Sequence, residues 1–257
     1  MPRFAANLTM MFTEVDFLDR FSAAAQAGFD AVEYLFPYAF PADQIAQKLR
    51  QFGLTQALFN LPPGDWEAGD RGLAALPDRK QEFRASVTTA LEYADASGVK
   101  RLHLMSGLAD PSDPIARATY RQSLDYLCDK AGEAGLDVVV EPINARDMPG
   151  YFLNNFDFAA DLIADAGQPN LKLQFDIYHR QIIHGDVLVG LRTLMPLIGH
   201  IQIAAVPSRH EPGTGELDDV RILSELDRLG YGGFVGCEYR PAGATKDGLG
   251  WLKAFES

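Results

Sequence analysis

Short apolar runs, rich in β-branched residues, alternate along this chain with longer stretches in which apolar residues recur every three or four positions. A short run is typical of a strand buried on both faces, and the longer spacing is typical of an amphipathic helix. The segments Phe17–Ala25 and Phe83–Ala94 show the helical spacing. The pattern predicts eight strands, at Arg3–Asn7, Ala31–Phe36, Thr55–Asn60, Arg101–Met105, Val138–Glu141, Lys172–Asp176, His200–Ala204 and Phe234–Glu238.

Glycines mark the ends of several predicted helices, because glycine accepts the left-handed backbone of a helix C-cap. Strands that alternate with helices pair in parallel, since each crossover returns the chain to the same end of the sheet. Eight such units predict a single (β/α)8 barrel that occupies residues 1–257 as one α/β domain. The capping glycines are Gly28, Gly53, Gly98, Gly135, Gly167 and Gly230.

The composition narrows the classes of function. Acidic residues outnumber basic ones by 35 to 23, for a net charge of −12, whereas nucleic-acid-binding proteins usually present a basic surface. The first residues lack the apolar segment of a secretory signal, and no run approaches the ~18 apolar residues that span a bilayer. Cys128 and Cys237 are not in a paired, metal-binding spacing. We expect a soluble, cytoplasmic protein with neither a nucleic-acid nor a membrane partner.

Polar side chains with oxygen ligands come from four successive predicted strands. Glu141 and Asp176 end the fifth and sixth, Gln202 lies in the seventh, and Glu238 ends the eighth. In a barrel of this kind the active site lies at the carboxyl ends of the strands. Three carboxylates and an amide oxygen suit Mg²⁺ or Mn²⁺ better than a structural zinc ion. The competing interpretation is that each is an ordinary polar residue facing water, but acidic residues are rarely buried unless paired or bound to metal.

Histidine and arginine side chains near these strand ends are candidates for substrate binding. His179 follows Asp176 by three residues, so we expect it to face the site. Arg209 could bind a substrate carboxylate through two parallel hydrogen bonds, although a surface arginine would look the same in the sequence. For His103 and His184 we expect a solvated or capping role.

The longest predicted loop runs from Leu61 to Pro77, after the third strand. Loops of this length in compact domains are often functional. Within it, Trp66 and Arg71 could close over a ligand or pack on the barrel rim.

The chain resembles the hydroxypyruvate isomerase family, within the xylose-isomerase-like TIM barrels, over nearly its whole length. The motifs that carry the resemblance are Arg3–Leu8, Phe36–Tyr38, Asn60–Trp66, Val140–Asn144, Asp176–His179, His200–Ala204, Arg209–Glu216 and Gly236–Tyr239.

The resemblance implies metal binding by Glu141, Asp176, Gln202 and Glu238, and proton transfer by Glu141 and Glu238. It implies an isomerase that interconverts hydroxypyruvate and tartronate semialdehyde through a metal-stabilised enediolate. The 2-oxo-tetronate isomerases share nearly all of these motifs, so that substrate is an alternative. The partner would be a small hydroxy-oxo acid, and a homo-oligomer is left open.

Two other functions compete with the isomerase. An apurinic-site endonuclease would call for more histidine ligands and a basic DNA track, while this chain offers Gln202 in the seventh strand and an acidic charge. A non-catalytic barrel that binds a sugar acid would use the strand-end carboxylates only as hydrogen-bonding groups.

Overall fold

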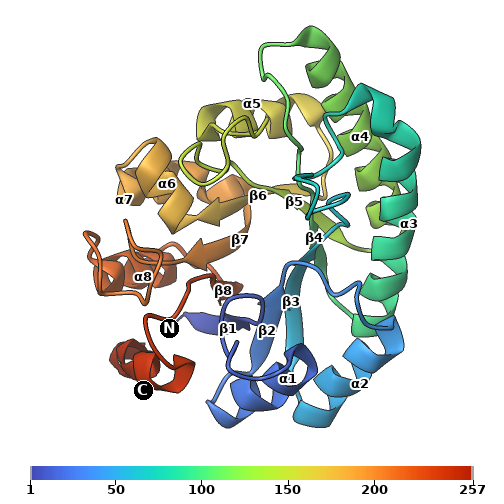
Figure 1. The fold of residues 1–257 in the computed structure, drawn as a ribbon. Coiled ribbons are helices and arrows are strands. Elements are labelled where there is room, and N and C mark those ends of the chain that lie inside the picture. Colours follow the sequence, from blue (N-terminus) through green and yellow to red (C-terminus); the bar gives the residue numbers. More distant parts are fainter. Residues whose placement is uncertain (1, 256–257) are drawn as a thin grey trace.

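The computed structural model describes residues 2–255 and shows eight parallel strands that close into a barrel in sequence order, β1 to β8 (Figure 1). The fold class predicted from the sequence is therefore confirmed, and each predicted strand is present to within two residues at either end. The strands are β1 (Arg3–Asn7), β2 (Ala31–Tyr34), β3 (Thr55–Asn60), β4 (Arg101–His103), β5 (Asp137–Val140), β6 (Leu171–Asp176), β7 (Ile198–Ile203) and β8 (Phe234–Cys237).

Helices surround the barrel and bury the outer face of its strands (Figure 1). All six glycines predicted to end helices have a positive φ, and Gly53, Gly98 and Gly167 are themselves left-handed C-cap residues. The α-helices are α1 (Phe17–Gln26), α2 (Ala42–Phe52), α3 (Lys80–Ser97), α4 (Pro114–Glu133), α5 (Phe156–Ala166), α6 (Ile177–Ile183), α7 (Val187–Leu194) and α8 (Asp219–Arg228), and the 3-10 helices are η1 (Pro77–Arg79), η2 (Met195–Leu197) and η3 (Thr245–Phe255).

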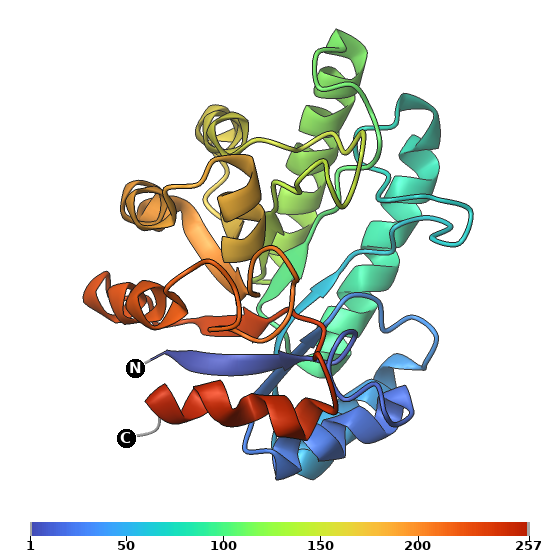
Figure 2. The same cartoon turned by 60° about the vertical axis from the view of Figure 1, so that its left-hand side comes forward.

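The expected regular repeat of one helix per strand is wrong at two places. Two α-helices, α6 and α7, and the 3-10 helix η2 separate β6 from β7. Gly185 and Asp186, which both have positive φ, lie between α6 and α7. After β8 the chain forms the 3-10 helix η3, which lies beside β1 (Figure 2). Trp251 and Phe255 of η3 pack edge-on against Phe4 of β1. The aromatic contacts explain why this last element stays against the barrel without an α-helical period.

The main hydrophobic core fills the layer between the barrel and its helices. A second, smaller cluster consists of Ala5, Ala31 and Ala57, with Phe234 packed against it. Each fully buried Leu, Val or Phe contributes about 1.5–3 kcal/mol relative to an exposed one. This large core fixes the strands, and the strands in turn fix the positions of the side chains at their ends.

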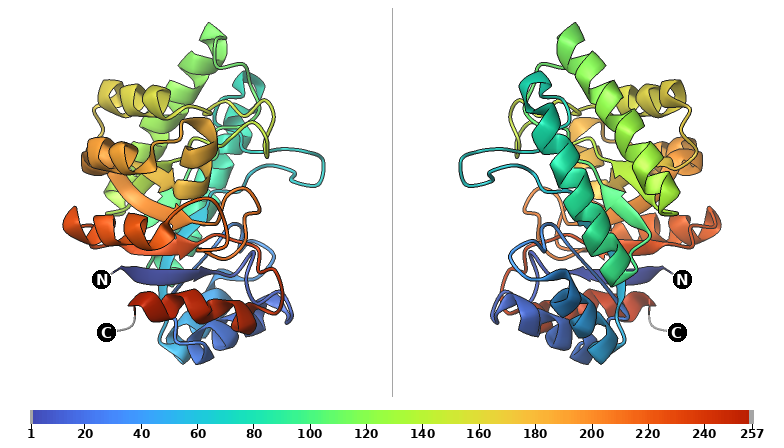
Figure 3. Two further views of the ribbon diagram at one scale, coloured as in Figure 1. Left: turned by 90° about the vertical axis from the view of Figure 1, so that its left-hand side faces the viewer. Right: turned by 90° about the vertical axis from the view of Figure 1, so that its right-hand side faces the viewer.

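The loop of residues 61–76, between β3 and η1, projects beyond the barrel (Figure 3). Asp70 stabilises it by accepting hydrogen bonds from the backbone of Asp65 and from the guanidinium of Arg79. Within the described residues, every helix is too short or too polar to cross a bilayer.

Candidate active site

A cavity of about 850 Å³ opens at the carboxyl end of the barrel. Polar side chains from several strands line it, among them Asn60, His103, Glu141, Gln174 and Glu238. Glu141 and Glu238 each stand one residue beyond the end of a strand, β5 and β8 respectively. The cavity therefore lies where the strand ends bring candidate catalytic groups together, as a barrel of this kind leads one to expect.

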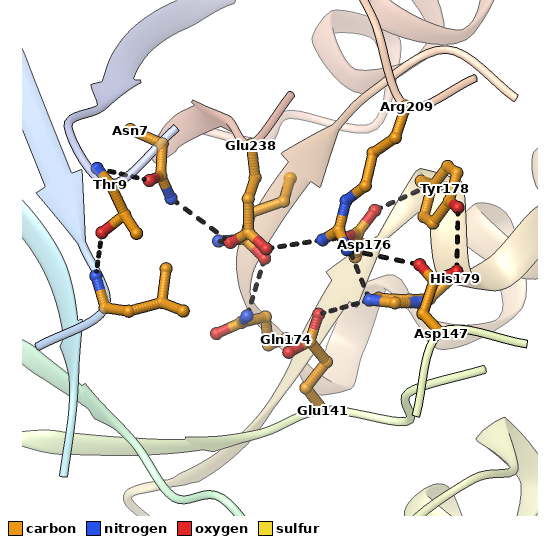
Figure 4. A network of polar contacts seen from close by, with 12 residues as sticks. Asn7, Thr9, Glu141, Asp147, Gln174, Asp176, Tyr178, His179, Arg209 and Glu238 are labelled. Carbon is orange, nitrogen blue, oxygen red and sulfur yellow. Dashed lines mark hydrogen bonds and ion pairs between the residues drawn. The ribbon is translucent and has the colours of Figure 1, made fainter. Parts of the chain in front are cut away.

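Glu141, Asp176 and His179 form a cluster suited to a metal ion, since each offers a ligand atom and these atoms lie within 4.8 Å of one another. His179 Nε2 lies 3.9 Å from Glu141 Oε1 and 3.7 Å from Asp176 Oδ2 (Figure 4). Both of these carboxylate oxygens are buried and accept no hydrogen bond from any described residue. A buried polar atom without a partner is rare and calls for an explanation such as an ion. Two of the four predicted ligands are thus free to bind a cation.

Burial raises the pKa of all three predicted carboxyl ligands. It raises the pKa of Asp176 to about 6 and that of Glu238 to about 8, although the Arg209 guanidinium opposes both shifts. The pKa of Glu141 lies well above its usual range because of burial, with repulsion from Glu238 and Asp176 added to it. A nearby cation stabilises the ionised form of such groups. The electrostatics of the site therefore favour a positively charged ligand.

Arg209 lies among the acidic groups rather than in solvent, with a side chain that is only 14% exposed. Its Nη2 donates to Glu238 Oε1 at 2.6 Å and lies 3.7 Å from Asp176 Oδ2. Its Nη1 donates to Asp147 Oδ2 at 3.4 Å, and its guanidinium carbon lies 4.8 Å from the centre of the Tyr178 ring (Figure 4). The structure places Arg209 in the cavity, as the substrate-clamp hypothesis requires.

The carboxamide of Gln202, the fourth predicted ligand, is occupied by other side chains. Its Nε2 donates to Glu33 Oε1 at 2.8 Å and to Glu238 Oε2 at 2.5 Å. Its Oε1 accepts from Gln174 Nε2 at 2.7 Å. Gln202 is 1% exposed, and Gln174 rather than Gln202 lines the cavity. A metal role for Gln202 stays a prediction that would require Gln174 to yield its contact.

His179 is held by Asn144, whose backbone N–H donates to Nδ1 at 3.3 Å while its side-chain nitrogen lies 2.7 Å from the same atom. The Asn144 carboxamide oxygen already accepts from the backbone of Asp147 at 2.9 Å, so its nitrogen faces His179. Because Nδ1 then acts as an acceptor, the neutral ring carries its proton on Nε2. His179 therefore points an N–H toward Glu141 and Asp176, and in this tautomer the two carboxylates, rather than the imidazole, are the groups that can bind an ion.

The expectation for His103 is wrong, and that for His184 fits. His103 is 1% exposed and lines the cavity, and its Nε2 lies 3.7 Å from Glu141 Oε2. Burial, helped by His200, lowers its pKa to about 3, so the ring is neutral. Glu141 is thus flanked by two neutral imidazoles, His103 and His179. His184 is the C-cap residue of α6.

Trp66 and Arg71 both line the cavity, and both also pack on the rim. The Arg71 guanidinium carbon lies 3.8 Å from the centre of the Trp66 ring, and Nη1 donates to the backbone oxygens of Trp66 and Asp70. Trp66 packs in turn against Phe36 at 5.2 Å between ring centres. The structure therefore fits both roles considered for Trp66 and Arg71, packing on the barrel rim and covering a ligand.

Sequence reasoning missed a group of buried polar residues at and below the floor of the cavity, chiefly Gln174, which lines it, and Asn7, Glu33 and His200. Glu33 carried a usable signal, because it is an acidic residue in the middle of the apolar strand β2. Asn7 and Gln174 carried none, because a neutral amide in a strand does not reveal its partner.

The sequence profile of the xylose isomerase-like TIM barrel family matches residues 21–255 of this chain. A 2-oxo-tetronate isomerase from Cupriavidus necator is 54% identical over 257 residues, with 99% of both chains covered. A hydroxypyruvate isomerase from Escherichia coli is 41% identical, covering 99% of this chain and all of that protein. The crystal structure of a Brucella melitensis protein titled AP endonuclease, family 2, superimposes with a TM-score of 0.97 at 48% identity, with both chains fully covered.

The isomerase names of the first two relatives are consistent with the carboxyl groups that line the cavity at the strand ends. Identities of 41–54% to isomerases over almost the full length confirm the expected enzyme class, an isomerase of the intramolecular oxidoreductase type. The chain belongs to the xylose isomerase-like TIM barrel family.

Proposed function

We propose that this enzyme is a divalent-metal-dependent isomerase of a small hydroxy-oxo acid, with Glu141 and Glu238 as its proton-transfer groups. The observation that carries the proposal is the pair of buried, unpartnered oxygens of Glu141 and Asp176 beside His179. These are hard oxygen donors, which fit Mg²⁺ or Mn²⁺. Glu141, Asp176 and Glu238 would hold the ion, with the amide oxygen of Gln202 as the fourth ligand. The bound ion would act as a Lewis acid toward the substrate oxygens.

The reaction moves a carbonyl group between two adjacent carbons. One glutamate removes the proton from the hydroxyl-bearing carbon, and the other delivers a proton to the former carbonyl carbon. The hydroxyl proton passes from the first oxygen to the second, so that atoms and charge balance. Glu141, just after β5, and Glu238, just after β8, approach the cavity from different sides of the barrel, as a two-sided transfer requires (Figure 4). Burial raises the pKa of Glu238 to about 8, which suits proton exchange near neutral pH, and it raises the pKa of Glu141 as well.

Two further groups would bind the substrate. The Nε2–H of His179 would donate to a substrate oxygen and share the charge of the enediolate. Arg209 would bind the substrate carboxylate, and its contacts with Glu238 and Asp147 hold the guanidinium close to the reacting atoms. These local positive groups offset the net charge of −12, which repels an anionic substrate at long range.

For the substrate, the higher identity to the Cupriavidus necator protein, 54% against 41%, favours a 2-oxo-tetronate. Hydroxypyruvate, the acid expected from the sequence, is the second candidate. A nuclease is disfavoured because the chain has a net charge of −12, whereas DNA binding calls for a basic surface. We place the enzyme in the cytoplasm on the grounds of its sequence.

Purified protein incubated with hydroxypyruvate and with 2-oxo-tetronates, and followed by NMR, tests this proposal. We expect isomerised product, loss of turnover after EDTA, and recovery on addition of Mg²⁺ or Mn²⁺. Binding of these acids without turnover would instead show a non-catalytic barrel. Full activity after exhaustive removal of metal would refute the metal dependence.

Changing Arg209→Lys is expected to lower kcat/KM for acid substrates by about 10–100-fold, the worth of a charge-assisted hydrogen bond that a point charge does not reproduce. Neutral ketoses, if turned over, should be affected much less. The matched control is Arg192→Lys on α7, where the arginine pairs with Glu225 outside the barrel. Equal losses on charged and neutral substrates would show that Arg209 acts only on the structure of the site.

A further inference from the structure

Glu33 lies inside the barrel, is 1% exposed, and takes no part in the proton transfers of the proposed reaction. Its Oε1 accepts hydrogen bonds from Asn7 Nδ2 at 3.0 Å and from Gln202 Nε2 at 2.8 Å. Its Oε2 lies 2.7 Å from His200 Nε2. Three strands, β1, β2 and β7, are thus tied together by one carboxylate below the cavity.

The barrel makes room for this carboxylate at Gly236 of β8. A Cβ at that position would lie 2.3 Å from Glu33 Oε2, far inside van der Waals contact. Any larger residue would therefore displace the carboxylate from its partners. Three hydrogen-bond donors therefore fix the position of the Glu33 carboxylate. The space that it occupies is left open because residue 236 is a glycine.

An ionised carboxylate only accepts hydrogen bonds, so it dictates which end of a neighbouring carboxamide faces it. The nitrogen of Gln202 must point to Glu33, and the same nitrogen also donates to Glu238 Oε2 at 2.5 Å. The oxygen of Gln202 must then point away, and there it accepts from Gln174 Nε2 at 2.7 Å. The direction of the second amide follows from that of the first.

This series of hydrogen bonds, from Glu33 through Gln202, ends at Gln174. With its nitrogen turned to Gln202, Gln174 is left with a buried Oε1 that no described residue contacts by a hydrogen bond, and Gln174 lines the cavity. Gln174 and Asp176 lie on the same face of β6, two residues apart. Gln174 thus stands beside the cation site, and its nitrogen holds the Gln202 oxygen that the ion would bind.

We propose that Glu33 is a positioning residue that holds the Gln202 carboxamide by its nitrogen, so that the Gln202 oxygen, and not its N–H, is left to accept from Gln174 or to bind the cation. The proposal rests on the metal dependence proposed above. Groups that orient metal ligands without touching the ion typically contribute 10–100-fold in metal affinity. Glu33 reaches the ion only through Gln202, which makes its effect dependent on that residue.

The test measures Mn²⁺ affinity of the metal-depleted full chain by calorimetry, in wild type, Glu33→Gln, Gln202→Met and the double variant. Glutamine at position 33 keeps the volume but lets either end of its own amide face Gln202. We expect Glu33→Gln to weaken Mn²⁺ binding about 10–100-fold. The double variant should be no weaker than the worse single variant by more than about threefold, because residues acting through one another are non-additive.

The matched control is Glu225→Gln, a residue that is 7% exposed and pairs with Arg192 and Arg228 outside the barrel. It should leave Mn²⁺ affinity unchanged. If Glu33→Gln does not fold, Glu33→Asp, which keeps the charge but shortens its reach, is measured in the same way. Unchanged affinity, or a loss that adds to that of Gln202→Met, would overturn the role of Glu33 alone. Absence of Mn²⁺ binding in the wild type would overturn the proposed function as well.

Discussion

Changing Glu141→Gln is expected to reduce turnover by about 10²–10⁴-fold, the usual worth of a positioned general acid or base. The change breaks no hydrogen bond of Glu141 Oε1, and turnover is measured at saturating Mn²⁺ because Glu141 is also a proposed metal ligand. Glu238→Gln should cause a loss of similar size. There, however, Arg209 donates to one oxygen while Asn7 and Gln202 donate to the other, so an amide nitrogen meets a donor on either side. We therefore expect a lower melting temperature only for Glu238→Gln.

The double variant should cost little more than the worse single one, because two groups that act in one proton relay are strongly non-additive. Incubation of each variant with substrate in D₂O separates their roles. The variant that retains the base should still exchange a substrate C–H for deuterium without completing isomerisation, as followed by NMR. Wild-type turnover in Glu238→Gln would refute the two-glutamate mechanism and make His179 the leading candidate.

The sequence was sufficient for the fold and for the residues at the strand ends. Strand ends are readable because a polar residue that closes an apolar run marks the point where the chain leaves the core. Glu141, Asp176 and Glu238 follow this rule, and the structure brings all three to one region. The left-handed glycines were readable for a related reason, since few other residues adopt that backbone without cost.

The contacts within the site were not readable, because they depend on how side chains from distant strands meet. His103 could face either side of β4, and only the closed barrel shows that it faces the cavity. Arg209 reaches Glu238 from a left-handed backbone with φ of 56°, and the neighbouring residues in the sequence do not predict that conformation. The role of Glu33 depends on a missing side chain at Gly236, on another strand. Long-range complementarity of this kind has no local sequence signal.

Changing Asp176 is expected to remove the metal site while the barrel stays folded. Asp176 has two separate functions in the structure. Its Oδ1 caps α6 by accepting from the backbone of Tyr178 at 2.7 Å, while its buried Oδ2 has no hydrogen-bond partner among the described residues. Asp176→Asn can keep the cap but loses the charge, whereas Asp176→Ala loses both. Both variants should weaken Mn²⁺ binding by at least about 100-fold, beyond the usual cost of losing an outer partner.

Thermal unfolding separates the two functions, since loss of a cap costs about 0.5–2 kcal/mol and only the alanine variant loses it. Asp113 provides the matched control, because it caps α4 through Ile115 at 2.9 Å in the same manner, with no link to the cavity. Asp113→Ala should lower the melting temperature and leave Mn²⁺ binding intact. Metal content and Mn²⁺ affinity are measured by elemental analysis and calorimetry on wild type, Asp176→Asn, Asp176→Ala and Asp113→Ala. Wild-type metal content in Asp176→Asn would show that this carboxylate is a helix cap alone, and the ion would then have to be held without it.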